Sequence, residues 1–125
     1  GNTTLVLRYY EIKLLDLVGF RPQLLTCVDC HKEIQAEDQY FSSELGGVLC
    51  PLCGQKKPGA IPISMLALKY LRHLQRSNYA EARHASIPTY VNREMEAIMQ
   101  YYLTYLLERK LNTPGFLRRV IQEGK

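Results

Sequence analysis

Apolar positions recur at helical spacing in three stretches of the chain. In the first stretch, residues 5–18, apolar side chains fall three and four positions apart, while Arg8, Lys13 and Asp16 lie off this stripe. The stripe consists of Leu7, Tyr10, Leu14, Leu15 and Val18. Gly19 suits a C-terminal cap, and Pro22 prevents the helix from continuing. The pattern therefore predicts a helix that buries this stripe in the core.

The second helix is predicted to follow Pro62, with Ser64 as its N-cap. Ala67, Leu71 and Leu74 form its apolar face, with Tyr70 at the border. Basic side chains share the opposite face at i, i+3, i+4 and i+7. They are Lys69, Arg72, His73 and Arg76.

A third, long helix is predicted from about Tyr90 to Leu111. Its core stripe consists of Met95, Ile98, Met99, Tyr102, Leu103 and Leu106. Residues 77–89 precede this helix. They are predicted to form a polar connection that can contain one short helical turn. Pro114 suits the start of a final short helix.

All four cysteines lie in the stretch between the first two helices, as two C-x2-C pairs: Cys27 with Cys30, and Cys50 with Cys53. Nineteen residues separate the pairs, within the range expected for a structural zinc site. A two-residue gap lets a tight turn present two thiolates on one side, and four thiolates close a tetrahedron without an open position. The pattern predicts structural Zn²⁺. Two disulfides, iron in a rubredoxin-like cage and haem attachment at Cys27-x-x-Cys30-His31 are the alternatives.

Between the pairs, residues 40–41 and 48–49 flank Gly46-Gly47, which predicts short strands in a hairpin. We expect Tyr40 and Phe41 to pack against the cysteine turns; a stacking surface for nucleic acid is the alternative. Pro51 is expected to preset φ inside the second turn, and Gly54 to accept a positive φ. The predicted fold is mainly α: one helical-bundle domain over residues 1–125, with a four-cysteine zinc ribbon of short β-hairpins inserted at residues 21–60.

Charge divides the chain into an acidic and a basic part. The formal charge is +4, yet residues 27–54 carry −4, so the rest carries +8. Residues 56–93 hold seven cations against Glu81 alone, whereas a face that is merely solvated normally mixes signs. These cations favour anion binding, with solubility as the alternative. They are Lys56, Lys57, Lys69, Arg72, Arg76, Arg83 and Arg93. No recognition helix that reads bases is evident, so we expect sequence-independent phosphate contacts.

No catalytic constellation is recognisable. The chain lacks a G-x-S-x-G elbow, a phosphate-binding glycine loop and an H-E-x-x-H zinc motif. We therefore predict a binding module rather than an enzyme, without a small-molecule substrate. No apolar run is long enough to cross a membrane, and cysteines suited to metal favour a reducing cytoplasm. Gly1 does not look like a natural start, so further sequence is expected upstream.

Several segments together resemble the carboxy-terminal region of the bacterial RecO recombination-mediator family. They are LRYYEIKLLD at 7–16, GFRP at 19–22, the first cysteine pair, YFSSELGGVLCP at 40–51, LKYLR at 68–72 and YLLERKL at 105–111. The resemblance covers nearly the whole chain in the right order. It implies a helical domain with a zinc ribbon, preceded in the family by an amino-terminal OB-fold that this chain lacks.

The resemblance also implies function. Family members bind single- and double-stranded DNA, anneal strands, bind RecR, recognise the acidic, Phe-terminated tail of single-stranded DNA-binding protein (SSB) and help to load RecA. This implies a DNA-repair module of the bacterial cytoplasm, associated with the nucleoid. For the SSB tail we predict an apolar pocket rimmed by cations, made by Leu106, Leu107, Arg109, Lys110, Phe116 and Arg118. The surroundings of Leu71 and Arg72 are a second candidate. The competing interpretation is a zinc module that binds only proteins.

Overall fold

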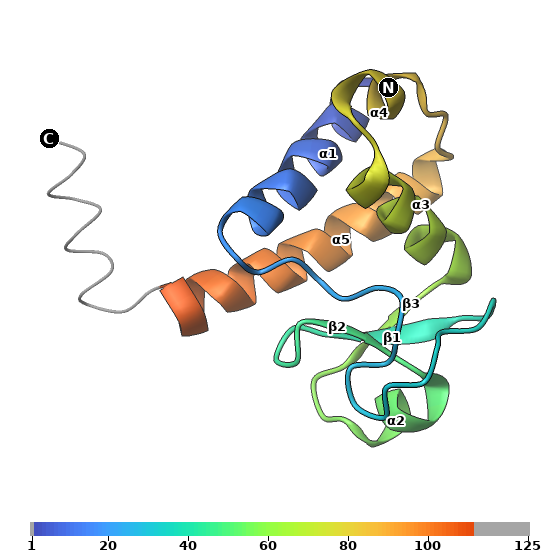
Figure 1. Ribbon diagram of the computed structural model, residues 1–125, viewed down its shortest axis with the longest axis vertical. Helices are drawn as coiled ribbons and strands as arrows, with labels where there is room; N and C mark the ends of the chain where they lie inside the picture. The colour runs from blue at the N-terminus through green and yellow to red at the C-terminus, as the bar shows by residue number, and fades with distance from the viewer. Residues whose placement is uncertain (1, 112–125) are drawn as a thin grey trace, which may run out of the picture.

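The computed structural model describes residues 2–111, and the side chains of residues 5–109. Helices form most of it, with one small sheet beside them (Figure 1). In chain order the elements are α1 (Asn2–Leu17), β1 (Gln39–Ser42), β2 (Gly47–Leu49), α2 (Pro51–Lys56), β3 (Ile61–Ile63), α3 (Met65–Arg76), α4 (Tyr79–His84), α5 (Thr89–Leu106) and the π-helical turn η1 (Leu107–Leu111). Within this part of the chain, no helix is long and apolar enough to cross a membrane. The predicted mainly α fold with a small β-ribbon is confirmed, and the predicted final helix lies outside the described residues.

The predicted core face of α1 is wrong. Leu7, Tyr10 and Leu14 each remain more than half exposed, and of the predicted stripe only Leu15 is buried. The buried face instead consists of Leu5, Arg8, Tyr9, Ile12 and Leu15. α1 carries apolar side chains on two sides, so its spacing fits either face, and packing against α3, α4 and α5 selects one of them.

The end of α1 follows the prediction. Gly19 has a φ of 86°, which is the left-handed conformation of a helix C-cap. The amide of Phe20 donates to the carbonyl of Leu15, and that of Gly19 to the carbonyl of Asp16. These two bonds form a Schellman motif and turn the chain towards the cysteine segment.

α3 buries its predicted apolar face, whereas Arg72 and His73 of its predicted basic face are half-buried. Ser64 caps α3, because its hydroxyl accepts the amide hydrogen of Ala67 at 3.1 Å. The predicted short helical turn is α4, which starts with a capping box between Asn78 and Glu81. The core stripe of α5 is buried, apart from the half-buried Leu103.

The sheet has the order β2-β1-β3, with both neighbouring pairs antiparallel. Tyr40 pairs with Leu49 and Phe41 with Val48, which confirms the predicted hairpin around Gly46-Gly47. Gly46 adopts a φ of 74° in the turn. Gly47 has no room for a side chain, since a Cβ would lie 2.6 Å from the carbonyl oxygen of Gln23.

One cluster of buried side chains runs through both the ribbon and the helices. The rings of Phe41 on β1 and Tyr102 on α5 meet edge to face, with centroids 5.3 Å apart. The Tyr102 hydroxyl donates to the carbonyl of Phe20 at 2.8 Å. Burial, with a smaller contribution from Tyr105, raises the pKa of Tyr102 to about 12, so the hydroxyl keeps its proton for this bond. The sheet is thereby fixed against the long helix (Figure 1).

A buried arginine connects α1 with α5. Arg8 Nε lies 2.5 Å from a carboxylate oxygen of Glu11, and Arg8 Nη1 lies 3.0 Å from one of Glu96. The Arg8 side chain is 5% exposed, whereas Glu96 remains half exposed. A guanidinium group buried this deeply is stable only while carboxylates such as those of Glu11 and Glu96 pair with it.

We predict that Arg8→Ala lowers the free energy of unfolding by about 2–3 kcal/mol, because it removes a buried hydrogen-bonded cation and its packing. Arg21→Ala is the control, since Arg21 and Asp16 form an exposed pair at 3.7 Å that contributes less than about 0.5 kcal/mol. Urea denaturation followed by circular dichroism measures both variants. Equal effects of the two substitutions would contradict the structural role of Arg8.

Candidate metal centre

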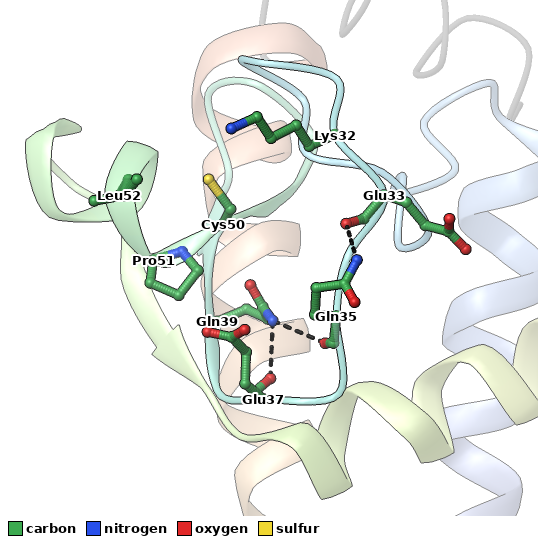
Figure 2. Close-up of a pocket in the computed structure, with 8 residues that line it drawn as sticks. All are labelled: Lys32, Glu33, Gln35, Glu37, Gln39, Cys50, Pro51 and Leu52. Carbon is green, nitrogen blue, oxygen red and sulfur yellow. Dashed lines mark hydrogen bonds between the residues drawn. The ribbon is translucent and has the colours of Figure 1, made fainter.

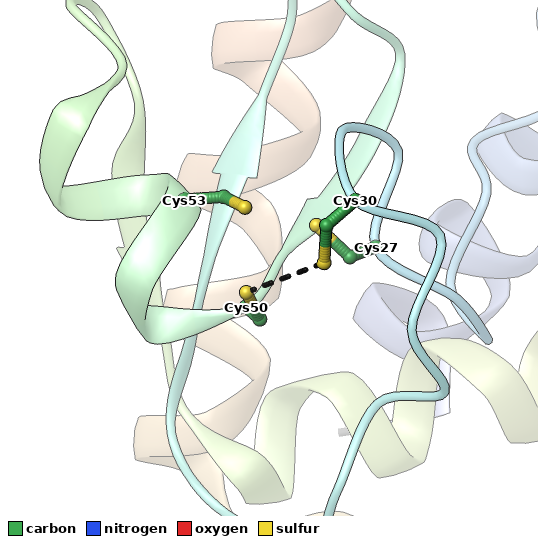
Figure 3. Close-up of side chains that lie close together, drawn as sticks. All are labelled: Cys27, Cys30, Cys50 and Cys53. Atoms are coloured by element: carbon green, nitrogen blue, oxygen red, sulfur yellow. Dashed lines mark hydrogen bonds between the residues drawn. The ribbon is translucent and has the colours of Figure 1, made fainter.

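The four cysteine sulfurs converge on one point between the ribbon turns (Figure 3). All four Sγ atoms lie within 4.8 Å of one another, and those of Cys30 and Cys50 are 3.8 Å apart. A tetrahedral site with metal–sulfur bonds of about 2.3 Å places its sulfurs about 3.8 Å apart. The arrangement therefore fits one metal ion. A disulfide needs sulfurs about 2 Å apart, and all four cysteines are free.

Backbone hydrogen bonds bring the first turn to the second. The amide of Val28, inside the first turn, donates to the carbonyl of Val48 on β2. Gln23, which precedes that turn, exchanges hydrogen bonds with the carbonyl of Gly46 and the amide of Val48. Because β2 ends directly before Cys50, these bonds place Cys27 and Cys30 opposite Cys50 and Cys53.

The second cysteine pair sits at the start of α2. Cys50 is the N-cap residue, Pro51 occupies the first turn, and Cys53 follows one turn later on the same side. The prediction for Pro51 needs refinement: its fixed φ starts a helix rather than shaping a loop. His31 closes the first turn with a φ of 66°, a left-handed conformation that glycine usually takes.

The sequence predicts a positive φ as the reason for glycine at position 54, and this reason is wrong. Gly54 is not left-handed; it lies inside α2 and is buried. A Cβ at this position would lie 2.3 Å from Cγ and Cδ2 of Tyr40, so the aromatic ring requires the missing side chain. Tyr40 and Phe41 both pack inwards, as predicted. Phe41 is 2% exposed, which excludes it as a stacking surface for bases.

The pKa values of Cys27 and Cys53 are shifted in opposite directions. Burial raises the pKa of Cys27, but hydrogen bonds from the backbone at Cys30, Cys50 and Asp29 outweigh this and lower it to about 6. Hydrogen bonding with Cys50, followed by burial, raises the pKa of Cys53. Thiolates this close repel one another, and a cation between them is what allows all four to ionise.

The predicted DNA-binding cations occupy different environments. Lys56, Lys69, Arg76, Arg83 and Arg93 are exposed, and among residues 5–109 no carboxylate lies at ion-pair distance from them. Lys57 instead pairs with Glu44 at 3.1 Å. The Arg72 Nε donates to the carbonyl of Leu24 at 2.8 Å, and burial, with a contribution from Arg76, lowers the pKa of Arg72. Arg72 therefore connects α3 to the ribbon through this hydrogen bond. It is not part of a freely exposed basic face.

The elements that carry the basic residues lie at different ends of the molecule (Figure 1). α2, which ends at Lys56, lies at the opposite end of the longest axis from α4, which carries Arg83. Lys69 and Arg76 are two turns apart on α3, so they share one side of that helix. The structure thus groups the α3 and α4 cations at the helical end and leaves Lys56 at the ribbon end.

The predicted SSB-tail pocket is described only in part. Leu106 is buried, whereas Leu107 and Arg109 are exposed. Leu106 lines a hollow with Phe20, Leu45 and Tyr102, and Arg109 lines a different one along α5. The side chain of Lys110, together with Phe116 and Arg118, lies outside the described residues. The second candidate is disfavoured, since Leu71 is buried and Arg72 is engaged with Leu24.

Sequence reasoning missed Gln39, which is buried at the start of β1 near the cage. Its amide bonds to two carbonyls of the preceding loop. The only available signal was a polar residue at the start of a predicted strand, which does not distinguish a buried amide from an exposed one.

We predict that Gly54→Ala destabilises the protein by about 1–3 kcal/mol, because the new methyl group overlaps the Tyr40 ring. Intrinsic helix propensity alone predicts the opposite sign, since alanine favours helices by about 1 kcal/mol over glycine. Gln55→Ala, at the next, exposed position of α2, is the control and should change stability little. Thermal unfolding of the metal-loaded protein measures both, and a stabilised Gly54→Ala would refute the steric explanation.

Comparisons with known proteins agree with the resemblance. The family model described as "Recombination protein O C terminal" matches residues 1–114. A DNA repair protein RecO from Roseiflexus sp. is 37% identical over 118 residues, which cover 94% of this chain and 42% of the relative. One from Dehalococcoides mccartyi is 36% identical over 112 residues, covering 87% of this chain and 44% of the relative.

The chain spans less than half the length of these curated relatives. No solved structure gives a significant match. The match to the family model extends over nearly the whole chain and includes the four-cysteine segment that forms the cage. The chain belongs to the RecO family of DNA repair proteins, and its residues correspond to the carboxy-terminal part of that family.

Proposed function

We propose that this chain is a non-enzymatic DNA-repair mediator module that binds DNA through its helices and protein partners through other surfaces. The observation that carries the proposal is the set of exposed cations on the helical part, Lys69, Arg76, Arg83 and Arg93, without carboxylate partners among the described side chains. Unpaired surface cations attract phosphates and release the counterions that surround DNA. The acidic cysteine segment, residues 27–54 with a charge of −4, is then turned away from the nucleic acid.

We refine the predicted DNA surface accordingly. The four helical cations contact phosphates directly, with Lys56, the last residue of α2, as an outlying contact. Arg72 instead connects α3 to Leu24, and Lys57 pairs with Glu44 inside the ribbon. Since Phe41 is buried and no described element presents a row of base-reading side chains, binding is independent of sequence.

We propose structural Zn²⁺ in the four-thiolate cage. Cys27, Cys30, Cys50 and Cys53 supply the tetrahedral all-sulfur set that zinc accepts, and four protein ligands leave no position for water or substrate. Bound zinc would hold both cysteine turns together. The proposed organisation is one domain over residues 1–125 with the ribbon, residues 21–60, inserted in it; the shared core of ribbon and helices supports this.

We propose further that the acidic SSB tail docks near the end of α5. The hollow lined by Phe20, Leu45, Tyr102 and Leu106 offers the apolar side chains that a terminal aromatic residue needs, and Arg21 and Glu44 also line it. Its volume is about 280 Å³. The alternative is the pocket predicted from the sequence. It combines Leu106 with Leu107, Arg109, Lys110, Phe116 and Arg118. RecR docking rests on family membership alone.

For the metal, native mass spectrometry of the purified protein should find one zinc ion per chain. Cys53→Ser should lose it or weaken its retention against a chelator, because three thiolates hold the ion less tightly than four. Removing zinc should abolish the dispersed amide signals of residues 23–56 and leave those of α5 less affected. A chain that carries iron, or an unchanged spectrum after complete zinc removal, would contradict the proposal.

For DNA, we expect salt-sensitive binding of a labelled single-stranded oligonucleotide, followed by fluorescence anisotropy. The double variant Lys69→Ala/Arg76→Ala should weaken binding and flatten the salt dependence, by about 0.7 per lost contact in the slope of log K against log salt. Arg21→Ala is the matched control, an exposed arginine that already pairs with Asp16.

The SSB tail peptide, added as competitor, tests the second partner. Displacement of DNA would place both ligands on one basic surface, whereas binding without displacement would support the separate hollow near Phe20. An affinity that does not depend on salt would contradict phosphate binding, and no DNA binding at low salt would favour the protein-only module.

A further inference from the structure

Three tyrosine rings lie together where α1 packs against α4, at the end of the molecule away from the ribbon (Figure 1). Tyr9 is buried, and its ring meets the other two edge to face, with its centroid 5.4 Å from that of Tyr10 and 6.1 Å from that of Tyr79. Tyr10 is 56% exposed and Tyr79 44% exposed; their centroids are 6.1 Å apart, and their planes are inclined by 32°. The buried ring therefore supports two exposed rings that lie next to each other. We call Tyr10 and Tyr79 the tyrosine patch.

The surroundings of the tyrosine patch are basic. Arg83 follows Tyr79 by one turn of α4, so both side chains share a face of that helix. Arg76 ends α3, shortly before Tyr79 in the chain. Lys13 follows Tyr10 by one turn of α1, and its Nζ lies 5.4 Å from the centroid of the buried ring. Arg76 and Arg83 are exposed and have no carboxylate at ion-pair distance among the described side chains.

The acidic side chains nearest in sequence are held by other groups. Glu11 pairs with the buried Arg8, and Glu81 accepts the amide hydrogen of Asn78 in the capping box of α4. Glu81 also follows Tyr79 by only two positions, which places it on another side of the helix. The positive charge beside the rings is therefore not neutralised, and it attracts an anion.

The tyrosine patch is an open surface. Neither ring lines the hollows beside the cage, along α5 or near Phe20. The hollow beside the cage contrasts with this patch, because polar side chains, Cys50, Pro51 and Leu52 line it and no aromatic ring does (Figure 2). An open aromatic surface among cations suits a ligand that is both flat and anionic. Single-stranded DNA has both properties in every nucleotide, since each base has a π-face and each link a phosphate.

We propose that Tyr10 and Tyr79 stack against bases of single-stranded DNA whose phosphates are held by Arg76 and Arg83. This inference rests on the proposed DNA-binding function and adds a preference for single strands. In a duplex the bases are stacked on one another and paired, so a duplex engages the cations alone. The exposed Leu7 and Leu14 flank Tyr10 on α1 and extend the apolar surface. A protein partner on this surface is the competing occupant.

The test compares a labelled oligothymidylate with an abasic strand of the same length, using fluorescence anisotropy and the whole, metal-loaded chain. Both strands carry the same phosphates, and only the first carries bases. The oligothymidylate should bind about tenfold more tightly, because stacking on aromatic side chains adds to the phosphate contacts. Equal affinities would overturn the stacking role and leave the phosphate contacts in place. No binding of either strand at low salt would overturn the DNA-binding function, and this inference with it.

Variants assign the effect to the two rings. Tyr10→Leu/Tyr79→Leu keeps apolar side chains without rings, so it should bind the oligothymidylate about tenfold more weakly and the abasic strand and the duplex as before. Tyr10→Phe/Tyr79→Phe keeps the rings and should retain the preference for the strand with bases. Tyr90→Leu is the matched control, since Tyr90 is exposed on α5 and has no ring partner among the described residues. A leucine variant that still prefers the strand with bases would overturn the assignment and leave the tyrosine patch to a protein partner.

Discussion

The convergence of four sulfur atoms is the constraint on which the ribbon depends. Its three strands are three or four residues long, too short to hold a sheet together without further contacts. The hydrogen bond between Val28 and Val48 brings the two cysteine turns to one point, and the end of β2 supplies the second turn directly. Sheet and cage are therefore one unit: each fixes the geometry that the other requires.

The long helix α5 connects this unit to the rest of the chain. Tyr102 packs against Phe41 and donates to the carbonyl of Phe20, so one side chain holds both the sheet and the segment that leads to the first cysteine turn. Arg72 and Gln75 on α3 add hydrogen bonds to Leu24 and Pro22. The ribbon is consequently fixed to the helices through buried contacts, and its acidic surface has a defined position relative to the basic one.

That separation of charge gives the module two kinds of surface. The helical cations lack carboxylate partners among the described side chains, whereas residues 27–54 carry a charge of −4. The basic surface suits phosphates, whereas the acidic segment 27–54 repels them.

The sequence by itself determined the three longer helices, the hairpin and the clustering of the four cysteines, because each follows from local spacing: apolar periodicity, a glycine turn and two C-x2-C pairs. Only the tertiary structure decided which side of α1 is buried, since that helix is apolar on two sides and its neighbours select one. It also decided that Arg72 ties elements together and that Gly54 makes room for the Tyr40 ring. These roles depend on residues far apart in sequence, and no local pattern encodes the distance between them.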